Sequence, residues 1–170
     1  MQIREAFPSD TSAIRRVHQA SIEELGPAAY STEQVEAWAR GCESADYTTA
    51  IRADTDHVIV AETATGVVGF GSISFDVDVE AYVTAADAEI TAVYVDPDSV
   101  RDGVGTAILT TLEQAARERM GAMIVLLSSL NAVPFYRQHG YERVRATAHE
   151  FSSRCSTGVE GEVIEMRKAL

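Results

Sequence analysis

Residues 88–109, AEITAVYVDPDSVRDGVGTAIL, combine an apolar strand, a turn, a Gly-x-Gly loop and the start of a helix. Residues 88–95 predict a long strand, and Pro97-Asp98 predicts the turn that follows it. A helix is expected over 106–120, because its apolar residues recur at helical spacing. The Gly103-Val104-Gly105 loop would direct backbone N–H groups and the positive end of the helix dipole at one point, which favours a bound anion.

Two well-known phosphate-binding loops do not match this one. A dinucleotide-binding loop would have a third glycine where Ile108 stands, and a P-loop would have Gly-Lys-Ser/Thr. Many strand-to-helix turns use glycine for backbone geometry alone, so that interpretation stays open. Asp102 directly precedes the first glycine, and we expect its side chain to point outward rather than touch an anion.

Length and composition predict a single domain over residues 1–170. The hydrophobic content of 46% and charged content of 24% are typical of a globular protein. No apolar run reaches the roughly 20 residues needed to span a bilayer. The first ten residues carry charges, so no secretion signal is expected, and the cytoplasm is the expected location. Cys42 and Cys155 are too few and too far apart for a disulfide framework or a zinc site.

The formal net charge of −12 excludes some partners. So acidic a surface repels nucleic acids and anionic membranes, and we expect neither as a partner. We expect the acidity to be halophilic, an adaptation to a salt-rich cytoplasm in which repulsion between carboxylates is screened. Attraction of cationic substrates is the alternative explanation.

The pattern along the chain predicts a mixed α/β fold with a partly parallel central sheet. Two early helices are expected, stopped by Gly26-Pro27 and by Gly41, and a hairpin is expected at Thr65-Gly66. The acidic stretch 76–87 is expected to be a surface loop or an edge strand. The expected helices are 9–25, 31–40, 106–120 and 131–139, and the expected strands are 3–7, 57–62, 67–75, 88–95, 122–127, 141–147 and 163–168.

Two segments together resemble the GCN5-related N-acetyltransferase (GNAT) superfamily: residues 88–109, quoted above, and residues 131–144, NAVPFYRQHGYERV. Residues 30–39, YSTEQVEAWA, are also similar to the second-helix region of a small-molecule-type branch of that superfamily. The resemblance covers essentially all of the chain. It implies the acyl-CoA N-acyltransferase fold, a central twisted sheet flanked by helices, with acetyl-CoA as co-substrate and no metal.

The resemblance implies where the cofactor lies. The backbone of Val93, Tyr94 and Val95 would run beside the pantetheine arm, and one N–H near Val93 would polarise the thioester carbonyl. Core packing of the two valine side chains is compatible with this role. The superfamily pattern has Gln or Arg where this chain has Val100, so cofactor affinity is the property that this departure affects. The pyrophosphate would be cradled by Arg101, Asp102, Gly103, Val104, Gly105 and Thr106.

The resemblance also implies two catalytic residues. Glu89 stands where many members carry a catalytic glutamate, and Tyr136 stands where a hydroxyl faces the sulfur of CoA. An ordinary glutamate would take a proton from an alkylammonium uphill by roughly 6 pKa units. Glu89 is therefore expected to act through water, with a raised pKa, or after attack has acidified the nitrogen. A surface glutamate and a core tyrosine are the alternative interpretations.

For several further residues, a role in the site and a purely structural role both stay open. Asn131 is a good N-cap for the helix 131–139, and the superfamily often uses this asparagine near the pantetheine, so both roles stay open. The four histidines show no metal-ligand spacing and are expected at surface or satisfied positions. Candidates for the wall of the acceptor site are the aromatic residues Tyr30, Trp38, Phe70 and Phe151, for which core packing is the alternative.

The function implied by the resemblance is transfer of an acetyl group to a primary amine of a small molecule, by direct attack in a ternary complex. A non-catalytic acyl-CoA-binding sensor is one alternative. Transfer to a protein N-terminus, to a hydroxyl group, or of a longer acyl chain is another. A homodimer stays open as the assembly.

Overall fold

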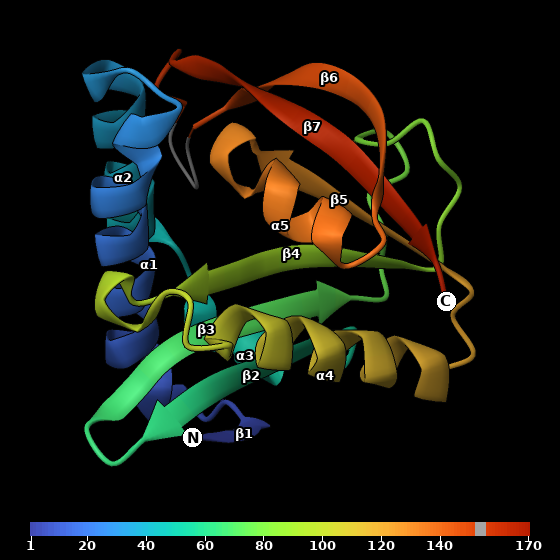
Figure 1. Cartoon of the computed structure of the whole chain (residues 1–170), viewed down its shortest axis with the longest axis horizontal. Coiled ribbons are helices and arrows are strands. Elements are labelled where there is room, and N and C mark those ends of the chain that lie inside the picture. The colour runs from blue at the N-terminus through green and yellow to red at the C-terminus, as the bar shows by residue number, and fades with distance from the viewer. Residues whose placement is uncertain (152–155) are drawn as a thin grey trace.

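The computed structural model describes residues 1–151 and 156–170, and the strands of these residues form one seven-stranded sheet (Figure 1). The strand order is β1-β2-β3-β4-β5-β7-β6, and every neighbouring pair is antiparallel except β4 and β5. This confirms the expected mixed sheet. The strands are β1 (Gln2–Glu5), β2 (Asp56–Thr63), β3 (Gly66–Ser74), β4 (Ala88–Val95), β5 (Met123–Ser129), β6 (Glu142–Glu150) and β7 (Glu160–Ala169).

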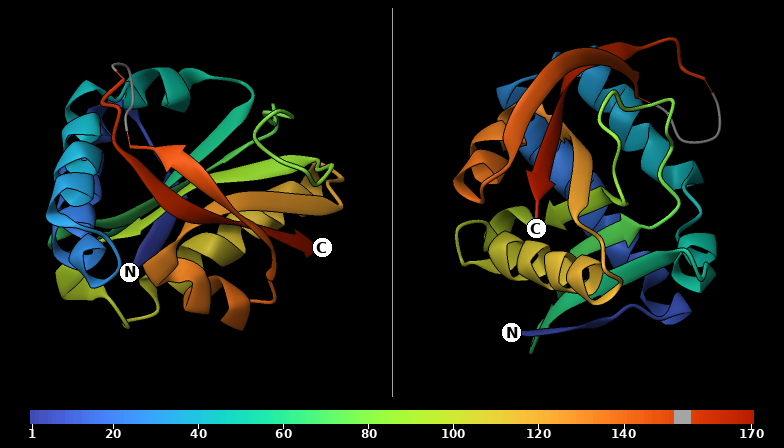
Figure 2. Two further views of the ribbon diagram at one scale, coloured as in Figure 1. Left: turned by 90° about the horizontal axis from the view of Figure 1, so that it is seen from above. Right: turned by 90° about the vertical axis from the view of Figure 1, so that its right-hand side faces the viewer.

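Helices cover both faces of the first strands (Figures 1 and 2). Neighbouring residues of a strand point to opposite faces. Ile59 and Ala61 of β2 therefore share a core with α4, whereas Val60 between them shares a core with α1. The α-helices are α1 (Thr11–Leu25), α2 (Thr32–Ser44), α3 (Tyr47–Arg52), α4 (Val104–Glu118) and α5 (Val133–Gln138).

The parallel strands β4 and β5 part soon after they begin. Their pairing comprises Ala88 with Ile124 and Glu89 with Val125, after which the strands diverge (Figure 1). On its other edge β4 stays paired with β3, and the Asp96 N–H continues that pairing with a 2.9 Å hydrogen bond to the Val68 carbonyl. Because alternate residues of an antiparallel strand bond to the same neighbour, the N–H groups of Val93 and Val95 face away from β3, toward the side of β5.

Helix α4 lies unusually close to β3 because two residues of that strand have no side chain. A methyl group at Gly71 would overlap Ile108 of α4, and one at Gly69 would lie 2.8 Å from Val104 and 2.9 Å from Ile108. Neither distance is compatible with normal packing. Glycine at both positions therefore sets the depth at which α4 rests on the sheet.

Most expected elements are present, and the early helices show the main differences. α1 ends at Leu25 as expected, but α2 continues through Gly41 to Ser44. Gly41 does not adopt a positive φ, and packing of the buried Cys42 offsets the cost of roughly 1 kcal/mol that glycine brings to a helix. The short helix α3 was not expected; its N-cap is Asp46, whose carboxylate accepts from the Thr49 N–H at 3.1 Å.

Asn131 is not the N-cap of α5, which corrects one of its two expected roles. α5 begins at Val133 with Ala132 at the N-cap, and Asn131 lies in the preceding 3-10 turn. Pro134 occupies the first turn of α5, where its missing N–H costs no hydrogen bond. A helix can therefore begin here without a side-chain cap.

Residues 76–87 form the expected surface loop between β3 and β4 (Figure 2). Cys155, one of the two cysteines, lies outside the described residues, and Cys42 is buried on α2. In the ranges that the structure describes, no helix is both long and apolar enough to cross a membrane.

Candidate active site

A cavity of about 890 Å³ lies at the N-terminus of α4 and along the parted edge of β4. We call it the larger cavity. Its wall includes Val93 and Val95 of β4, the loop before α4, and the first turns of α5. The expected cofactor residues in this wall are Val93, Tyr94, Val95, Arg101, Gly103, Gly105, Thr106 and Asn131.

The loop before α4 is shaped to point backbone N–H groups outward. Gly103 is the N-cap with φ 81°, and Arg101 has φ 72°, a left-handed conformation that a residue with a side chain rarely adopts. The first helical bond runs from the Ala107 N–H to the Gly103 carbonyl at 3.0 Å. The three amides before Ala107 therefore lack an acceptor within the helix and form, with the helix dipole, an anion-binding terminus.

The side chains around this loop differ in their placement. Arg101 and Val100 are exposed and line the larger cavity, so a cation is available beside the anion-binding amides. Asp102 is also exposed but is not part of the wall as described. The Val104 side chain is buried against the sheet, which leaves only its backbone available to a ligand.

His139, the C-cap residue of α5, contacts both the loop before α4 and the backbone of α5. Its Nδ1 lies 2.8 Å from the Phe135 carbonyl, which can only accept, so Nδ1 carries the proton. His139 Nε2 lies 3.1 Å from the Thr106 hydroxyl, within hydrogen-bond distance. Asn131, on the opposite side of the larger cavity, donates from Nδ2 to the Leu25 carbonyl at 3.5 Å and is exposed.

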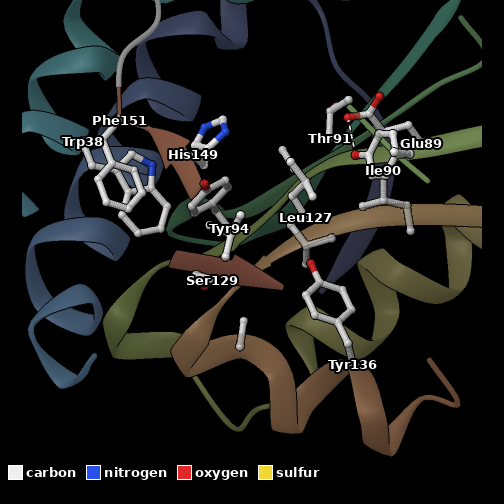
Figure 3. A pocket seen from close by; sticks show the side chains of 15 residues that line it. Trp38, Glu89, Ile90, Thr91, Tyr94, Leu127, Ser129, Tyr136, His149 and Phe151 are labelled. Carbon is white, nitrogen blue, oxygen red and sulfur yellow. Dashed lines mark hydrogen bonds between the residues drawn. The ribbon is translucent and has the colours of Figure 1, made fainter. Parts of the chain in front are cut away.

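A second cavity, of about 190 Å³, adjoins the larger one and extends along β4 toward the start of that strand (Figure 3). We call it the smaller cavity. Its wall contains Glu89 at the start of β4 and Thr91, the extra residue of a β-bulge where the register with β3 shifts. A bulge re-aims the side chains beside it, which places Glu89 at this cavity rather than at an ordinary strand position. Six residues belong to both walls: Trp38, Val93, Tyr94, Ser129, Ala132 and Tyr136.

The carboxylate of Glu89 is partly buried, and its pKa depends on this burial and on a hydrogen bond from Tyr82. Burial raises its pKa, while the Tyr82 hydroxyl, which donates to Oε1 at 2.7 Å, opposes that rise. Tyr82 itself is buried, and burial followed by the Glu89 charge raises its pKa, so it remains a hydrogen-bond donor. Figure 3 shows this bond at one end of the smaller cavity.

The loop that carries Tyr82 is held by an ion pair between the buried Glu165 and the partly exposed Arg145. The Glu165 side chain of β7 has no exposure; it accepts from the Thr84 N–H at 3.1 Å and from Arg145 Nε at 2.8 Å. Arg145 also donates from Nη2 to the Ala81 carbonyl at 3.1 Å. Burial alone would raise the pKa of Glu165, but Arg145 and the loop amides outweigh it and hold the pKa below its usual range.

Tyr136 of α5 lies where the two cavities meet. It is buried, and burial raises the pKa of its hydroxyl, so the group stays protonated. In the part of the chain that the structure describes, the hydroxyl has no hydrogen-bond partner, although its residue lines both cavities (Figure 3). The proton of Tyr136 is therefore available to a group that enters from either side.

The aromatic residues expected around an acceptor divide into two groups. Trp38 and Phe151 line the smaller cavity, with ring centroids 5.0 Å apart and an interplanar angle of 11°. Tyr30 lies outside both walls as described; its hydroxyl donates to the Glu162 carbonyl at 2.8 Å and accepts from the Leu130 N–H at 3.0 Å. Phe70 is buried and stacks on Tyr94 from the α1 side of the sheet.

The structure adds residues that the sequence analysis did not single out. Tyr82 and His149 line the smaller cavity, and His139 lines the larger one. Partial burial lowers the pKa of His149, and the Glu150 charge opposes that shift. Neither Tyr82 nor His149 lies in a recognisable motif, and their positions follow from tertiary contacts alone.

Comparison with known proteins places the chain in a family. Residues 27–154 match the model of the acetyltransferase (GNAT) domain. This match covers well over half of the chain, so the protein belongs to the GNAT acetyltransferases and is an acetyl-CoA-dependent acetyltransferase. No curated protein sequence matches the chain significantly.

Solved structures agree with this assignment. A GCN5-related N-acetyltransferase from Rhodopseudomonas palustris is 28% identical, with a TM-score of 0.82 over 99% of this chain and 95% of that one. The PaiA N-acetyltransferase from Thermoplasma acidophilum, solved with coenzyme A, is 18% identical with a TM-score of 0.73 over 99% and 98%. The ribosomal-protein-alanine N-acetyltransferase from Brucella melitensis is 22% identical with a TM-score of 0.65 over 100% of both chains.

Proposed function

We propose that this protein, as a single N-acetyltransferase domain, transfers the acetyl group of acetyl-CoA to the primary amine of a small molecule by direct attack in a ternary complex. One observation carries the proposal: two adjoining cavities along β4 share six wall residues, with an anion-binding helix terminus in the wall of the larger cavity and a carboxylate in the wall of the smaller one. A thioester bound in the larger cavity would present its carbonyl to an amine held in the smaller one. Such alignment supplies much of the rate enhancement of a two-substrate reaction.

The cofactor half of the proposal rests on backbone groups. The amides of Val104, Gly105 and Thr106 would bind the pyrophosphate of acetyl-CoA, with the exposed Arg101 as a nearby cation. The N–H groups of Val93 and Val95 face the parted side of β4; that of Val95 would pair with a pantetheine amide, and that of Val93 with the thioester carbonyl. The coenzyme A in the PaiA structure supports this choice of donor.

The chemistry uses three groups. Glu89, acting through water, accepts the proton that the ammonium must lose, and its raised pKa brings it closer to that task. The nitrogen lone pair then attacks the thioester carbon, and the Val93 N–H stabilises the oxyanion. Collapse breaks the C–S bond; the thiolate leaves with the electron pair and takes up the second proton of the nitrogen, while Tyr136 donates a hydrogen bond to the sulfur. The products are the acetamide and the free thiol of CoA.

A small acceptor is favoured by the dimensions of the site. The smaller cavity has a volume of about 190 Å³, and the half-buried Trp38 gives its wall an aromatic surface. The relatives with solved structures differ in the acceptors that their names state, and likeness of fold does not choose among them.

The test is release of the CoA thiol from acetyl-CoA with a panel of primary amines, in low and in high KCl, together with the change in melting temperature on adding CoA. We expect CoA to raise the melting temperature and at least one small amine to cause thiol release. A rise in melting temperature without release by any amine would indicate an acyl-CoA-binding sensor. No rise and no release would contradict the whole proposal.

A further inference from the structure

His139 lies in the wall of the larger cavity, and the acetyl transfer proposed above does not use it. As the C-cap residue of α5, it lies beside the first turn of α4, where the free amides of Val104, Gly105 and Thr106 would bind the pyrophosphate of CoA. Its Nε2 lies 3.1 Å from the Thr106 hydroxyl. A proton on that nitrogen therefore affects a side chain of the anion-binding terminus.

The His139 ring is held in place by α5 itself. Its Nδ1 lies 2.8 Å from the Phe135 carbonyl, one helical turn earlier. The ring also packs against the Phe135 ring, with centroids 4.5 Å apart. Phe135 in turn lies close to the loop before α4, because a methyl group at Gly105 would be 3.4 Å from it. Nε2 is thus directed at Thr106 before any ligand binds.

The hydrogen bond to Phe135 determines which nitrogen of His139 can gain or lose a proton. A carbonyl oxygen can only accept, so Nδ1 keeps its hydrogen in both charge states of the ring. The change of charge therefore occurs at Nε2, which is an acceptor in the neutral ring and a donor in the charged ring. Histidine is the side chain that most readily changes charge between about pH 5 and pH 8.

The charge of the ring decides what the Thr106 hydroxyl can do. This hydroxyl has one hydrogen to donate and two lone pairs. To bond with neutral His139 it must donate to Nε2, and the lone pairs that remain repel an anion. Beside protonated His139 it accepts from Nε2, and its own hydrogen is free to turn toward an anion. In the described part of the chain, the hydroxyl has no other hydrogen-bond partner that would compete for this hydrogen.

An anion at the α4 terminus would lie within reach of this hydroxyl. Thr106 is the third residue of α4, is exposed, and belongs to the wall of the larger cavity. Its backbone N–H is one of the three amides that have no acceptor within the helix. Only two carbon atoms separate this nitrogen from the hydroxyl oxygen, so one phosphate group can accept from both.

The charged groups around His139 leave its charge state free to respond to a ligand. Those on the elements packed beside it are Arg101, Asp102, Glu113, Arg117, Arg137 and Lys168. The buried one, Glu113, pairs with Lys168 at 2.7 Å, whereas Asp102 and the arginines are exposed to solvent, which screens their charges. Tyr141 stays uncharged, because burial raises its pKa. Among the described residues none forms an ion pair with His139, so a bound pyrophosphate would supply its counter-charge.

We propose that His139 is a positioning residue for the cofactor: it takes up a proton from solvent when the pyrophosphate of CoA binds, and thereby turns the Thr106 hydroxyl toward the pyrophosphate as a donor additional to the three amides. The charged ring and the freed hydroxyl both favour the anion, so the affinity for the cofactor rises as the pH falls. This inference rests on the proposed function, because it requires the pyrophosphate to lie at the α4 terminus.

The first experiment measures the Kd of 3′-dephospho-CoA by titration calorimetry. This probe is chosen because its pyrophosphate keeps its charge across the range used, whereas a phosphomonoester such as that of CoA titrates near about pH 6. For the parent protein, we expect the Kd to be at least about threefold lower near pH 6 than near pH 8. A Kd that does not change, or that rises as the pH falls, would overturn the inference.

The same titration counts protons. Repeating it near about pH 7 in buffers of different ionisation enthalpy gives the number of protons that binding takes up from solvent. We expect a net uptake between zero and one. Binding without proton uptake would overturn the inference and leave the proposed function intact.

Substitutions at both ends of the hydrogen bond separate proton linkage from a merely structural contact. His139→Gln cannot change its charge, so the pH dependence of the Kd and the proton uptake should both vanish. Thr106→Val keeps the branched shape without the hydroxyl and should lose most of the pH dependence, whereas Thr106→Ser should keep it. Thr110→Val makes the same change one turn later, at an exposed position outside the cavity wall as described, and should behave as the parent.

The outcomes distinguish this inference from the function on which it rests. Full pH dependence in His139→Gln or in Thr106→Val would overturn the inference. Variants that only melt at a lower temperature, with proton uptake unchanged, would show that the contact is structural and would also overturn it. Failure of the parent protein to bind either CoA or 3′-dephospho-CoA at any pH would contradict the proposed function as well.

Discussion

The Tyr82 hydroxyl donates a 2.7 Å hydrogen bond to Oε1 of Glu89, which links a loop residue to a residue of a central strand. Glu89 is fixed on a central strand, whereas Tyr82 comes from the 76–87 loop, which the Glu165–Arg145 ion pair holds in place. The loop thus sets both the direction and the proton affinity of the proposed base. Tyr82 is a positioning residue, because it acts through Glu89.

Replacing Tyr82 with phenylalanine should raise the pKa of Glu89, because the bond favours the ionised carboxylate. A hydrogen bond to a charged group contributes roughly 1.5 kcal/mol, so the shift should be about one pKa unit. Since the base must be ionised, the acidic limb of the kcat/KM profile moves to higher pH by that amount. An unchanged limb in a variant with the parent's melting temperature would contradict this role.

Replacing Glu89 with glutamine should lower activity and raise stability. Without the base, we expect kcat to fall at least about a hundredfold. Burial raises the folded-state pKa of Glu89, so its ionisation destabilises the folded protein as the pH rises through that pKa. Glutamine can still accept the Tyr82 hydrogen bond but carries no charge. The variant should therefore melt above the parent at pH 7–8, and this difference should shrink below about pH 4.

Both measurements on Glu89→Gln are needed to interpret the result. A variant that loses stability at neutral pH would indicate that interactions of the ionised carboxylate stabilise the folded protein by more than its burial destabilises it. The raised pKa predicts the opposite. A variant with full activity across the pH range would remove Glu89 from the mechanism.

Replacing Tyr136 with phenylalanine should lower kcat at least about tenfold with little change in stability. The hydroxyl has no hydrogen-bond partner among the described residues, so its removal breaks no internal contact, and the ring keeps its packing against Tyr141. Turnover and thermal melting of the same preparation separate the two effects. Undiminished kcat would show that the hydroxyl does not assist departure of the sulfur.

Replacing Val100 with arginine should tighten CoA binding. Val100 is exposed in the wall of the larger cavity, where the superfamily pattern has Gln or Arg. An added surface charge is worth up to roughly 1 kcal/mol, or about a fivefold lower Kd. The gain should shrink as KCl screens the charge, and Val100→Gln should gain less. Unchanged affinity in the arginine variant would mean that the phosphates lie beyond the reach of position 100.

Salt should stabilise the whole protein if its acidity is a halophilic adaptation. Repulsion within a chain of net charge −12 falls as the Debye length shortens to about 3 Å in 1 M salt. We expect the melting temperature to rise steadily with KCl in the absence of any ligand. A flat or falling curve would favour attraction of cationic substrates as the reason for the charge.

Local patterns predicted the elements well because each signal lies within a few residues. The strand 88–95 has the expected bounds, and α2 begins next to the expected first residue, with Ser31 as its N-cap and the Gln34 N–H donating to Ser31 Oγ at 3.3 Å. The Gly-x-Gly loop precedes a helix whose first amides are free, as its sequence indicated. The extent of α2 beyond Gly41 was missed, because the burial of Cys42 that offsets the glycine is a tertiary effect.

The composition of the smaller cavity was harder to predict because its wall is assembled from distant segments. Tyr82, Glu89 and His149 come from a loop and two strands on different parts of the sheet, and no spacing connects them. Tyr30 and Phe70 were reasonable candidates as aromatic residues near the right helices and strands. Their hydrogen bonds and stacking place them behind the site, where they hold α2 and Tyr94 in position.

Gly69 and Gly71 help to position the loop before α4, although neither has a charged or polar side chain. Because they let α4 sink toward β3, they fix how far the free amides at its first turn stand from the Val93 backbone. In the proposed complex, that separation is the length that the nucleotide and pantetheine parts of one CoA molecule would span together. Two glycines on the neighbouring strand β3 would therefore set the distance over which the site binds CoA.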